Sequence, residues 1–204
     1  MLPYRLTGTR QMTEMTTREQ YLVSAIHELA ASVFGPADYE IPADVKVTCG
    51  WPSKGGLASR RKTVGQCFAR SCSDVGVNEI FISPTQADTS DVLDILTHEL
   101  VHAIDDCENG HRAPFRRIAI AVGLTGKMTA TVAGDALRSK FADIQTKLGD
   151  YPHAALDLSG LKKQKSRQLK IECLDCGAVW RMSRKWLTQV TACPVCQSDN
   201  IETV

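Results

Sequence analysis

The sequence SDVLDILTHELVHAIDDCENGH, residues 90–111, determines how we interpret the rest of the chain. It contains His98-Glu99-Leu100-Val101-His102, the H-E-x-x-H pattern of zinc hydrolases. On a helix, residues four positions apart lie about 40° apart around the axis and about 6 Å along it, so both imidazoles can bind one metal ion. Zinc with three protein ligands keeps a fourth position for water, whose pKa falls to roughly 7. Glu99 can take a proton from that water as it attacks a carbonyl group.

The residues around this pattern predict an amphipathic helix. Ser90 is the expected N-cap, and Asp91 in the first turn suits the positive end of the helix dipole. Apolar residues recur at helical spacing and are expected to face the core: Leu93, Leu96, Leu100 and Ile104. We expect the helix to end at Asn109-Gly110, where glycine can adopt the left-handed conformation.

The position of His111 depends on that helix end. In a continuous helix it would lie about 13 Å beyond His102 and about 180° around the axis, out of reach of the same ion. A turn at Gly110 instead lets the chain double back and bring His111 to the metal. Three acidic residues are alternative third ligands, although we interpret them as a solvated helix end: Asp105, Asp106 and Glu108.

The motif His98-Glu99-Leu100-Val101-His102-Ala103, followed by Gly110-His111 and then Phe115, resembles the SprT-like or Spartan family of metallopeptidases. The resemblance implies an α+β fold, with a zincin-like domain whose helices pack on a small, roughly three-stranded sheet. It also implies a small C-terminal zinc ribbon, which several members carry. By position, His98, His102 and His111 would bind the catalytic Zn2+, and Glu99 would be the general base.

The resemblance also implies partners. The best-known members of the family cleave proteins covalently trapped on DNA, and DNA itself activates them. The expected partners are therefore DNA-bound protein substrates and DNA that is single-stranded or has single-stranded regions.

The composition sets limits on function and compartment. The chain has 204 residues, of which 43% are hydrophobic and 23% charged, and its net charge of +1 favours neither nucleic-acid nor membrane binding by the whole chain. The N-terminal residues have no apolar segment suited to a signal peptide, and no apolar run approaches the roughly 18 residues of a membrane span. Four of the eight cysteines have metal-type spacing. We therefore expect a cytoplasmic protein, nucleoid-associated in a prokaryote or phage, without a membrane partner.

Along the chain we expect a flexible tail (1–15), the zincin domain (16–149), a basic linker (150–170) and the ribbon (171–204). A first helix should begin at Thr17, which forms a capping-box pair with Gln20. Strands are expected at 45–49, 63–70 and 79–83, and further helices after Pro114 and around 137–148.

Several other residues could take part in catalysis or binding, but we expect most of them to have structural roles. The basic loop 51–62 is a solvated hairpin loop or a segment that grips phosphates. Four cysteines without ligand spacing are expected to be reduced thiols: Cys49, Cys67, Cys72 and Cys107. Phe115 should pack against the His111 loop, and Tyr151 and His153 are more often structural in such a position than catalytic.

A second metal site follows from Cys173-x2-Cys176-x16-Cys193-x2-Cys196, the spacing of a four-cysteine zinc ribbon. Four thiolates around zinc exclude water, so this Zn2+ would be structural. Cations before and within the ribbon are candidate nucleic-acid contacts: Lys162, Lys163, Lys165, Arg167, Lys170, Arg181, Arg184 and Lys185. They alternate with Trp180 and Trp186, a mixture that can bind phosphates and stack bases, or equally a solvated linker with two core tryptophans.

These observations lead to one main hypothesis and two alternatives. The main hypothesis is a DNA-associated zinc endopeptidase that acts on proteins bound or crosslinked to DNA. The first alternative is a zinc-ribbon nucleic-acid binding or transcription-associated adaptor whose zincin domain cleaves nothing. The second is a zinc hydrolase of peptides or small molecules in which the ribbon is only structural.

Overall fold

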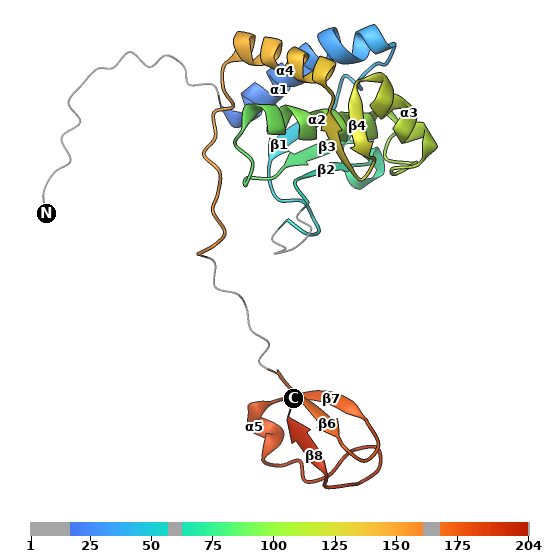
Figure 1. Ribbon diagram of the computed structural model, residues 1–204, viewed down its shortest axis with the longest axis vertical. Coiled ribbons are helices and arrows are strands. Elements are labelled where there is room, and N and C mark those ends of the chain that lie inside the picture. Colours follow the sequence, from blue (N-terminus) through green and yellow to red (C-terminus); the bar gives the residue numbers. More distant parts are fainter. Residues whose placement is uncertain (1–16, 57–62, 161–167, 204) are drawn as a thin grey trace, which may run out of the picture. The chain divides into compact units, whose positions relative to one another are not determined.

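The computed structural model describes residues 17–56, 63–160 and 168–203, and the chain divides into two compact units, Met1–Leu158 and Ser159–Val204 (Figure 1). Residues 150–158, expected to begin a linker, are counted with the first unit. The expected tail lies outside the described residues. Helices and small sheets alternate along the chain, which confirms the α+β class.

The first helix, α1 (Arg18–Leu29), begins as the sequence predicted. The Thr17 hydroxyl accepts a hydrogen bond from the Gln20 backbone N–H at 3.1 Å, and the Gln20 side chain accepts from the Thr17 N–H at 2.7 Å. The chain then continues through a π-helical turn, η1 (Ala30–Phe34), and a short 3-10 turn, η2 (Gly35–Ala37), which contains Pro36. The capping box thus fixes the start of the helix that covers one side of the core.

Three short strands form the sheet of the first unit: β1 (Lys46–Cys49), β2 (Gly65–Phe68) and β3 (Glu79–Ile82). Their order is β1-β3-β2, with β1 parallel and β2 antiparallel to β3. All three expected strands are present. Because β3 lies in the middle, β2 is an edge strand of this sheet, which the sequence alone could not establish.

The metal-motif helix, α2 (Thr89–Ile104), begins earlier than expected. Its N-cap is Asp88, whose carboxylate accepts the Asp91 N–H at 3.0 Å, so the prediction of Ser90 is wrong. Asp is as good an N-cap as Ser, and Asp88 lies two residues earlier in the chain. Thr89 is then the first helical residue, and it is buried.

The same helix also ends earlier, at Ile104 rather than at Asn109-Gly110. Asp106 and Cys107 both have left-handed backbones, with φ of 49° and 61°, and the Cys107 N–H bonds the His102 carbonyl at 2.8 Å. The cause is tertiary, because the Asp106 carboxylate accepts hydrogen bonds from the Arg70 N–H at 2.8 Å and from the Asn78 amide at 2.7 Å. These bonds anchor the chain beside the sheet.

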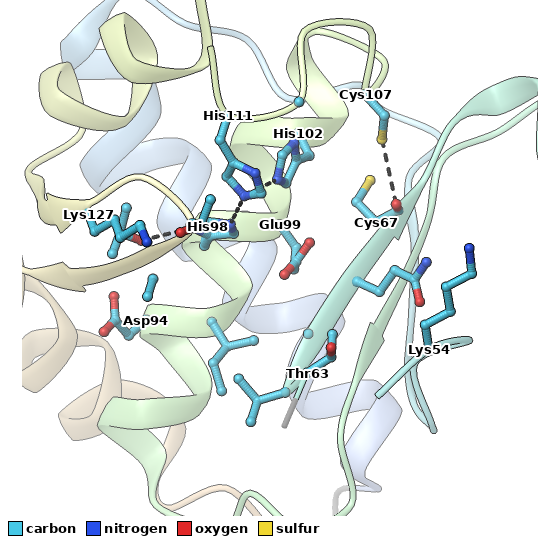
Figure 2. A pocket seen from close by; sticks show the side chains of 18 residues that line it. Lys54, Thr63, Cys67, Asp94, His98, Glu99, His102, Cys107, His111 and Lys127 are labelled. Atoms are coloured by element: carbon cyan, nitrogen blue, oxygen red, sulfur yellow. Dashed lines mark hydrogen bonds between the residues drawn. The ribbon is translucent and has the colours of Figure 1, made fainter. Parts of the chain in front are cut away.

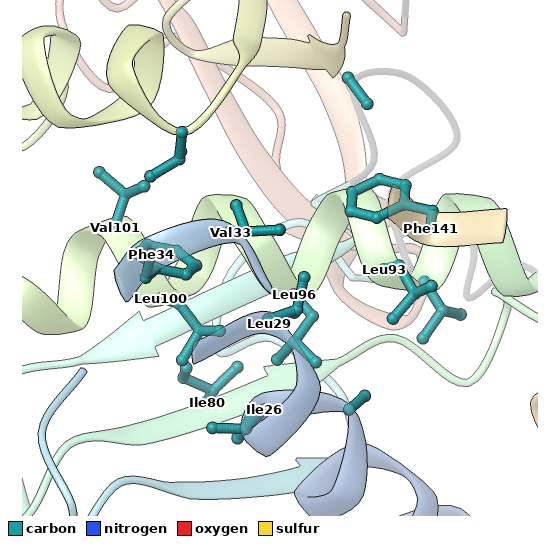
Figure 3. Packing of buried hydrophobic residues seen from close by; sticks show 14 of the residues in the cluster. Ile26, Leu29, Val33, Phe34, Ile80, Leu93, Leu96, Leu100, Val101 and Phe141 are labelled. Carbon is teal, nitrogen blue, oxygen red and sulfur yellow. The ribbon is translucent and has the colours of Figure 1, made fainter. Parts of the chain in front are cut away.

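The core of the first unit lies where α1, α2 and β3 meet (Figure 3). Leu93, Leu96 and Leu100 of α2 are fully buried there, as the helical spacing predicted. Leu29 and Phe34 enter from the first helical segment, and Ile80 enters from the sheet. Burial of so many apolar side chains stabilises this unit without any metal.

The remaining elements complete the first unit. Helix α3 (Ala113–Ala121) has Pro114 in its first turn, and α4 (Asp135–Leu148) is followed by Gly149 at φ 81°, both as expected. Between them lies a hairpin that the sequence analysis missed, β4 (Leu124–Lys127) paired antiparallel with β5 (Ala130–Ala133). Tyr151 packs on Tyr21, their ring centroids 5.4 Å apart, and it is almost fully buried.

The second unit is a small antiparallel sheet of β6 (Gln168–Cys173), β7 (Val179–Ser183) and β8 (Ile201–Thr203), with the short helix α5 (Arg184–Leu187). The strand order is β7-β6-β8. Its buried hydrophobic residues in the described ranges are Ile171, Cys173 and Cys193. So small a core needs another source of stability.

No helix within the described ranges is long and apolar enough to cross a membrane.

Candidate metal centres

Three histidines of the first unit converge on one point. His98 and His102 lie one turn apart on α2, and His111 returns from the turn that follows the helix (Figure 2). The Nε2 atom of His111 lies 3.2 Å from the Nε2 atoms of both His98 and His102. The structure therefore brings together the three predicted ligands in a group that could hold a metal ion.

The spacing of these nitrogens suits a tetrahedral ion. Zinc ligands at about 2.0–2.1 Å in a tetrahedron lie about 3.3 Å from one another. The Thr131 hydroxyl lies 2.8 Å from Nδ1 of His98 and can accept its proton, which leaves the Nε2 lone pair facing the shared point. This contact comes from the hairpin that the sequence analysis missed.

Burial keeps the three rings in the neutral form that binds a metal. Burial first, and the neighbouring histidines second, lower the pKa of His98 to about 4 and that of His102 to about 3. Burial also lowers the pKa of His111. Neutral imidazole is the form with a free lone pair, so these shifts favour metal binding at neutral pH.

The Phe115 ring packs against all three imidazole rings. It is fully buried, and its ring centroid lies 5.0 Å from those of His98 and His111 and 4.4 Å from that of His102. Contact with one rigid aromatic ring limits the rotation of each imidazole. This agrees with the expected packing role of Phe115.

Glu99 lies beside the three histidines and is almost fully buried. Burial raises the pKa of its carboxyl group to about 8, an effect that a hydrogen bond from the Cys67 backbone partly offsets. A divalent cation nearby would lower this pKa again, since an opposite charge favours the ionised form. Space for the carboxylate depends on Gly65, where an added Cβ would lie 2.6 Å from Oε1 of Glu99.

The histidines and Glu99 line a cleft of about 890 Å³. Residues 63–67, which include part of β2, form one wall, and residues from Lys127 to Thr131 of the β4–β5 hairpin form the other. Because β2 pairs on one side only, with β3, its other edge is free of strand pairing in the described sheet. The cleft thus combines a candidate metal centre with an open strand edge.

The sequence analysis did not place several residues in this cleft: Gly65, Asp94, Lys127 and Thr131 were not considered, and Cys67 and Cys107 were interpreted only as reduced thiols. Most are contributed by strands and turns far from the motif in sequence. A partial signal existed for Thr131, because Thr125, Thr129, Thr131 and Val132 give a β-branched stretch around Gly126. Nothing in that stretch pointed to a histidine partner.

The second candidate metal centre is formed by the four predicted cysteines. Sulfur atoms of Cys173 and Cys196 lie 3.5 Å apart, and those of Cys176 and Cys193 lie 3.7 Å apart. Four thiolates at about 2.3 Å from a tetrahedral zinc lie about 3.8 Å from one another. The described cysteines therefore form a group that could hold one metal ion.

Two similar turns hold these sulfurs in place. The Gly177 N–H bonds the Cys173 carbonyl at 2.9 Å, and the Gln197 N–H bonds the Cys193 carbonyl at 3.0 Å. Both turn residues are left-handed, with φ of 70° for Gly177 and 63° for Gln197. Asp175 joins the two turns, because its carboxylate accepts hydrogen bonds from the side chains of Ser198 and Asn200.

The predicted nucleic-acid contacts are only partly described by the structure. Lys170 on β6 lies opposite Arg181 on β7, but Lys170 also forms an ion pair with Glu172 at 3.1 Å. Arg184 and Lys185 belong to α5, where the Lys185 amine lies 5.1 Å from the ring centroid of the exposed Trp186. The other four predicted contacts lie outside the described residues: Lys162, Lys163, Lys165 and Arg167.

Comparison with protein-family models finds no match, and no curated protein or solved structure matches the chain either. The likeness to SprT-like metallopeptidases therefore rests on the motif residues alone.

Proposed function

We propose that the protein is a zinc-dependent endopeptidase of the SprT-like type that acts on proteins associated with DNA. The observation that carries the proposal is the convergence of the His98, His102 and His111 Nε2 atoms beside a buried Glu99 in an open cleft. Three imidazoles leave one tetrahedral position open, which is the ligand pattern of catalytic rather than structural zinc.

Each residue then has a defined role. His98, His102 and His111 would hold the ion, which when bound acts as a Lewis acid toward water and a peptide carbonyl. Glu99 accepts the proton that the attacking water releases and passes it to the leaving amine. Its position beside the three histidines in the wall of the same cleft supports this role, because a general base must lie near the water whose proton it accepts.

The cleft suggests how a polypeptide substrate is held. Strand β2 has no strand partner on one edge in the described sheet, and the backbone groups there that are not bonded to Glu99 or Cys107 could pair with an extended chain as an added strand. Glu99 packs directly against Gly65 at the start of this strand. A substrate paired with β2 would therefore lie next to the general base.

The proposed association with DNA rests on exposed residues of the second unit. Arg181, Arg184 and Lys185 are exposed, and Trp186 is 49% exposed beside Lys185. Exposed cations beside an exposed aromatic ring suit binding to phosphates and stacking on unpaired bases. The ribbon would thereby bring single-stranded DNA close to the peptidase.

The decisive test combines metal counting with proteolysis. We expect two zinc ions per chain and cleavage of a basic protein crosslinked to a single-stranded oligonucleotide. Glu99→Gln should retain both ions and lose cleavage, whereas Glu108→Gln, an exposed acid on the same segment, should behave like the wild type. Retained cleavage in Glu99→Gln would exclude the assigned base, and a single zinc confined to the cysteines would exclude the catalytic centre.

A non-proteolytic nucleic-acid binding protein is the second candidate function, favoured by the exposed pair of Lys185 and Trp186. This candidate predicts two bound zinc ions and DNA binding, with no cleavage of casein or of the crosslinked protein. In either case, Arg181→Gln and Arg184→Gln should each reduce the salt dependence of binding to single-stranded DNA, by about 0.7 in log–log slope for each lost phosphate contact. Lys140→Gln, an exposed cation of the first unit, is the control.

A further inference from the structure

Two thiols face one another in the wall of the cleft. Cys67 belongs to β2, and Cys107 lies in the turn between His102 and His111. The Cys107 sulfur lies 3.6 Å from the Cys67 carbonyl oxygen, and both thiol groups lie at the same place beside the cleft (Figure 2). Both residues are half-buried and line the cleft, so small reagents can approach them.

Groups other than the thiols hold Cys107 in this place. Its left-handed backbone is closed by the hydrogen bond from its own N–H to the His102 carbonyl. The preceding residue, Asp106, is bound through its carboxylate to the Arg70 N–H and to the fully buried Asn78. A left-handed conformation is unfavourable for a residue with a Cβ, so it persists here because the surrounding contacts impose it. The turn therefore holds the Cys107 thiol against the backbone of Cys67 in the reduced protein.

We propose that Cys67 and Cys107 form a reversible disulfide bond in the presence of oxidised glutathione. One thiol attacks the glutathione disulfide and releases one reduced glutathione, leaving a mixed disulfide on the protein. The second thiol attacks that mixed disulfide and releases the second reduced glutathione. The two cysteines lose two electrons and two protons, which the oxidised glutathione receives.

The bond would connect two parts of the cleft that are otherwise held by hydrogen bonds. Disulfide sulfurs lie about 2.05 Å apart, closer than any hydrogen-bonded contact, so oxidation draws β2 and the turn before His111 together. Both parts support the candidate site, since β2 contacts Glu99 and the turn delivers His111. A displacement of about 1 Å at a catalytic group can reduce a rate about 100-fold. This effect on activity rests on the proposed peptidase function, whereas formation of the bond does not.

The other described cysteines offer clear controls. Cys72 is exposed, and Cys49 is in contact with the Arg18 guanidinium at 3.6 Å. The four cysteines of the second unit would be protected as zinc ligands. Cys72→Ser therefore removes an accessible thiol without touching the proposed pair.

The test uses the full-length, zinc-loaded protein equilibrated with mixtures of reduced and oxidised glutathione. Bound disulfides are mapped by mass spectrometry of peptides, and zinc is counted in the same samples. We expect a peptide pair linked through Cys67 and Cys107 in the wild type and in Cys72→Ser, with two zinc ions retained. The link should disappear when a thiol reductant is added, and peptidase activity should fall about 100-fold on oxidation and return on reduction.

Two further variants each remove one cysteine of the proposed disulfide. Cys67→Ser removes one partner, and Cys107→Gly removes the other while suiting the left-handed backbone at that position. Both should give no link and an activity that oxidation does not change. Glutathione adducts or links to Cys72 in place of the 67–107 link, at every ratio tested, would overturn the proposal. If the link forms in a protein that cleaves nothing, the disulfide stands and the proposed peptidase function fails.

Discussion

The hydroxyl of Thr131, on β5, lies 2.8 Å from Nδ1 of His98, on α2. The two residues are far apart in sequence, and the contact exists because the β4–β5 hairpin forms the wall of the cleft opposite β2. A hydrogen bond to the outer nitrogen fixes both the tautomer and the orientation of a metal-binding imidazole. Thr131 would thus position His98 if the three histidines hold a metal ion.

Replacing that hydroxyl should weaken metal binding at one site only. Thr131→Val keeps the shape of the side chain but removes the acceptor, and we expect zinc affinity at the three-histidine centre to fall by about 10- to 100-fold. Competition with a chelator of known affinity measures the change. The four-cysteine centre should be unaffected, and Thr129→Val, on the same hairpin, is the control. Equal zinc affinity in both variants would show that the hydroxyl has no such role.

The space beside Glu99 should tolerate no side chain at residue 65. A Cβ on Gly65 would lie 2.5 Å from the Ile95 side chain and 2.6 Å from Oε1 of Glu99, so Gly65→Ala must displace the carboxylate. We expect retained zinc and a fall in peptidase kcat of about 100-fold, from misplacement of the base. Gly160→Ala, where a Cβ meets nothing within 4 Å, serves as the matched substitution. Normal kcat in Gly65→Ala would mean that Glu99 does not need its observed position.

The stability of the first unit should depend on the protonation of Asp94. Burial raises the pKa of this carboxyl group to about 6, with partly opposing effects of the Ala133 backbone and Arg138, and its buried Oδ1 atom has no hydrogen-bond partner among the described residues. The ordinary Asp pKa is about 3.9, so the folded state holds the proton more tightly than the unfolded chain. The contribution of Asp94 to the free energy of unfolding is therefore most favourable below about pH 4 and is lost as the pH rises through about 6.

An Asp94→Asn variant should accordingly unfold at a higher temperature than the wild type at pH 8 and show little difference at pH 4. Thermal denaturation at both pH values measures this, with the exposed Asp143→Asn as the comparison. A variant that is destabilised equally at pH 4 and pH 8 would contradict the assignment of the unfavourable charge to Asp94.

Removal of metal should affect the two units differently. The second unit has few buried apolar residues, so its fold depends on the ion that its cysteines would hold, whereas the first unit has a continuous core. A strong chelator should abolish the dispersed amide NMR signals of residues 168–203 while those of α1, α2 and β3 persist. Loss of both sets together, or of neither, would argue against this division of stability.

The sequence alone predicts those structural features that are determined by residues close together in the chain. The capping box at Thr17 and the apolar spacing of α2 depend on neighbouring residues, and both are present. The four-cysteine cluster follows from two short spacings that the turns at Gly177 and Gln197 realise in space.

The features that the sequence analysis missed depend on distant residues. The end of α2 is set by hydrogen bonds from Arg70 and Asn78 to Asp106, which no local pattern reveals. The β4–β5 hairpin has two four-residue strands, too short for a clear alternating pattern, and it is stabilised by packing against α2, α3 and α4. The partner of His98 lies on that hairpin, so it could not be identified before the hairpin was known.

The free edge of β2 has a consequence for which proteins could be cut. Backbone groups that are already paired in a folded target cannot also pair with this strand. A compact protein would first have to lose several residues of its own secondary structure, so the selectivity of such a peptidase would follow local unfolding of the target more than its amino-acid identity. A protein held rigid and intact would escape cleavage, and one partly unravelled by damage or crosslinking would not.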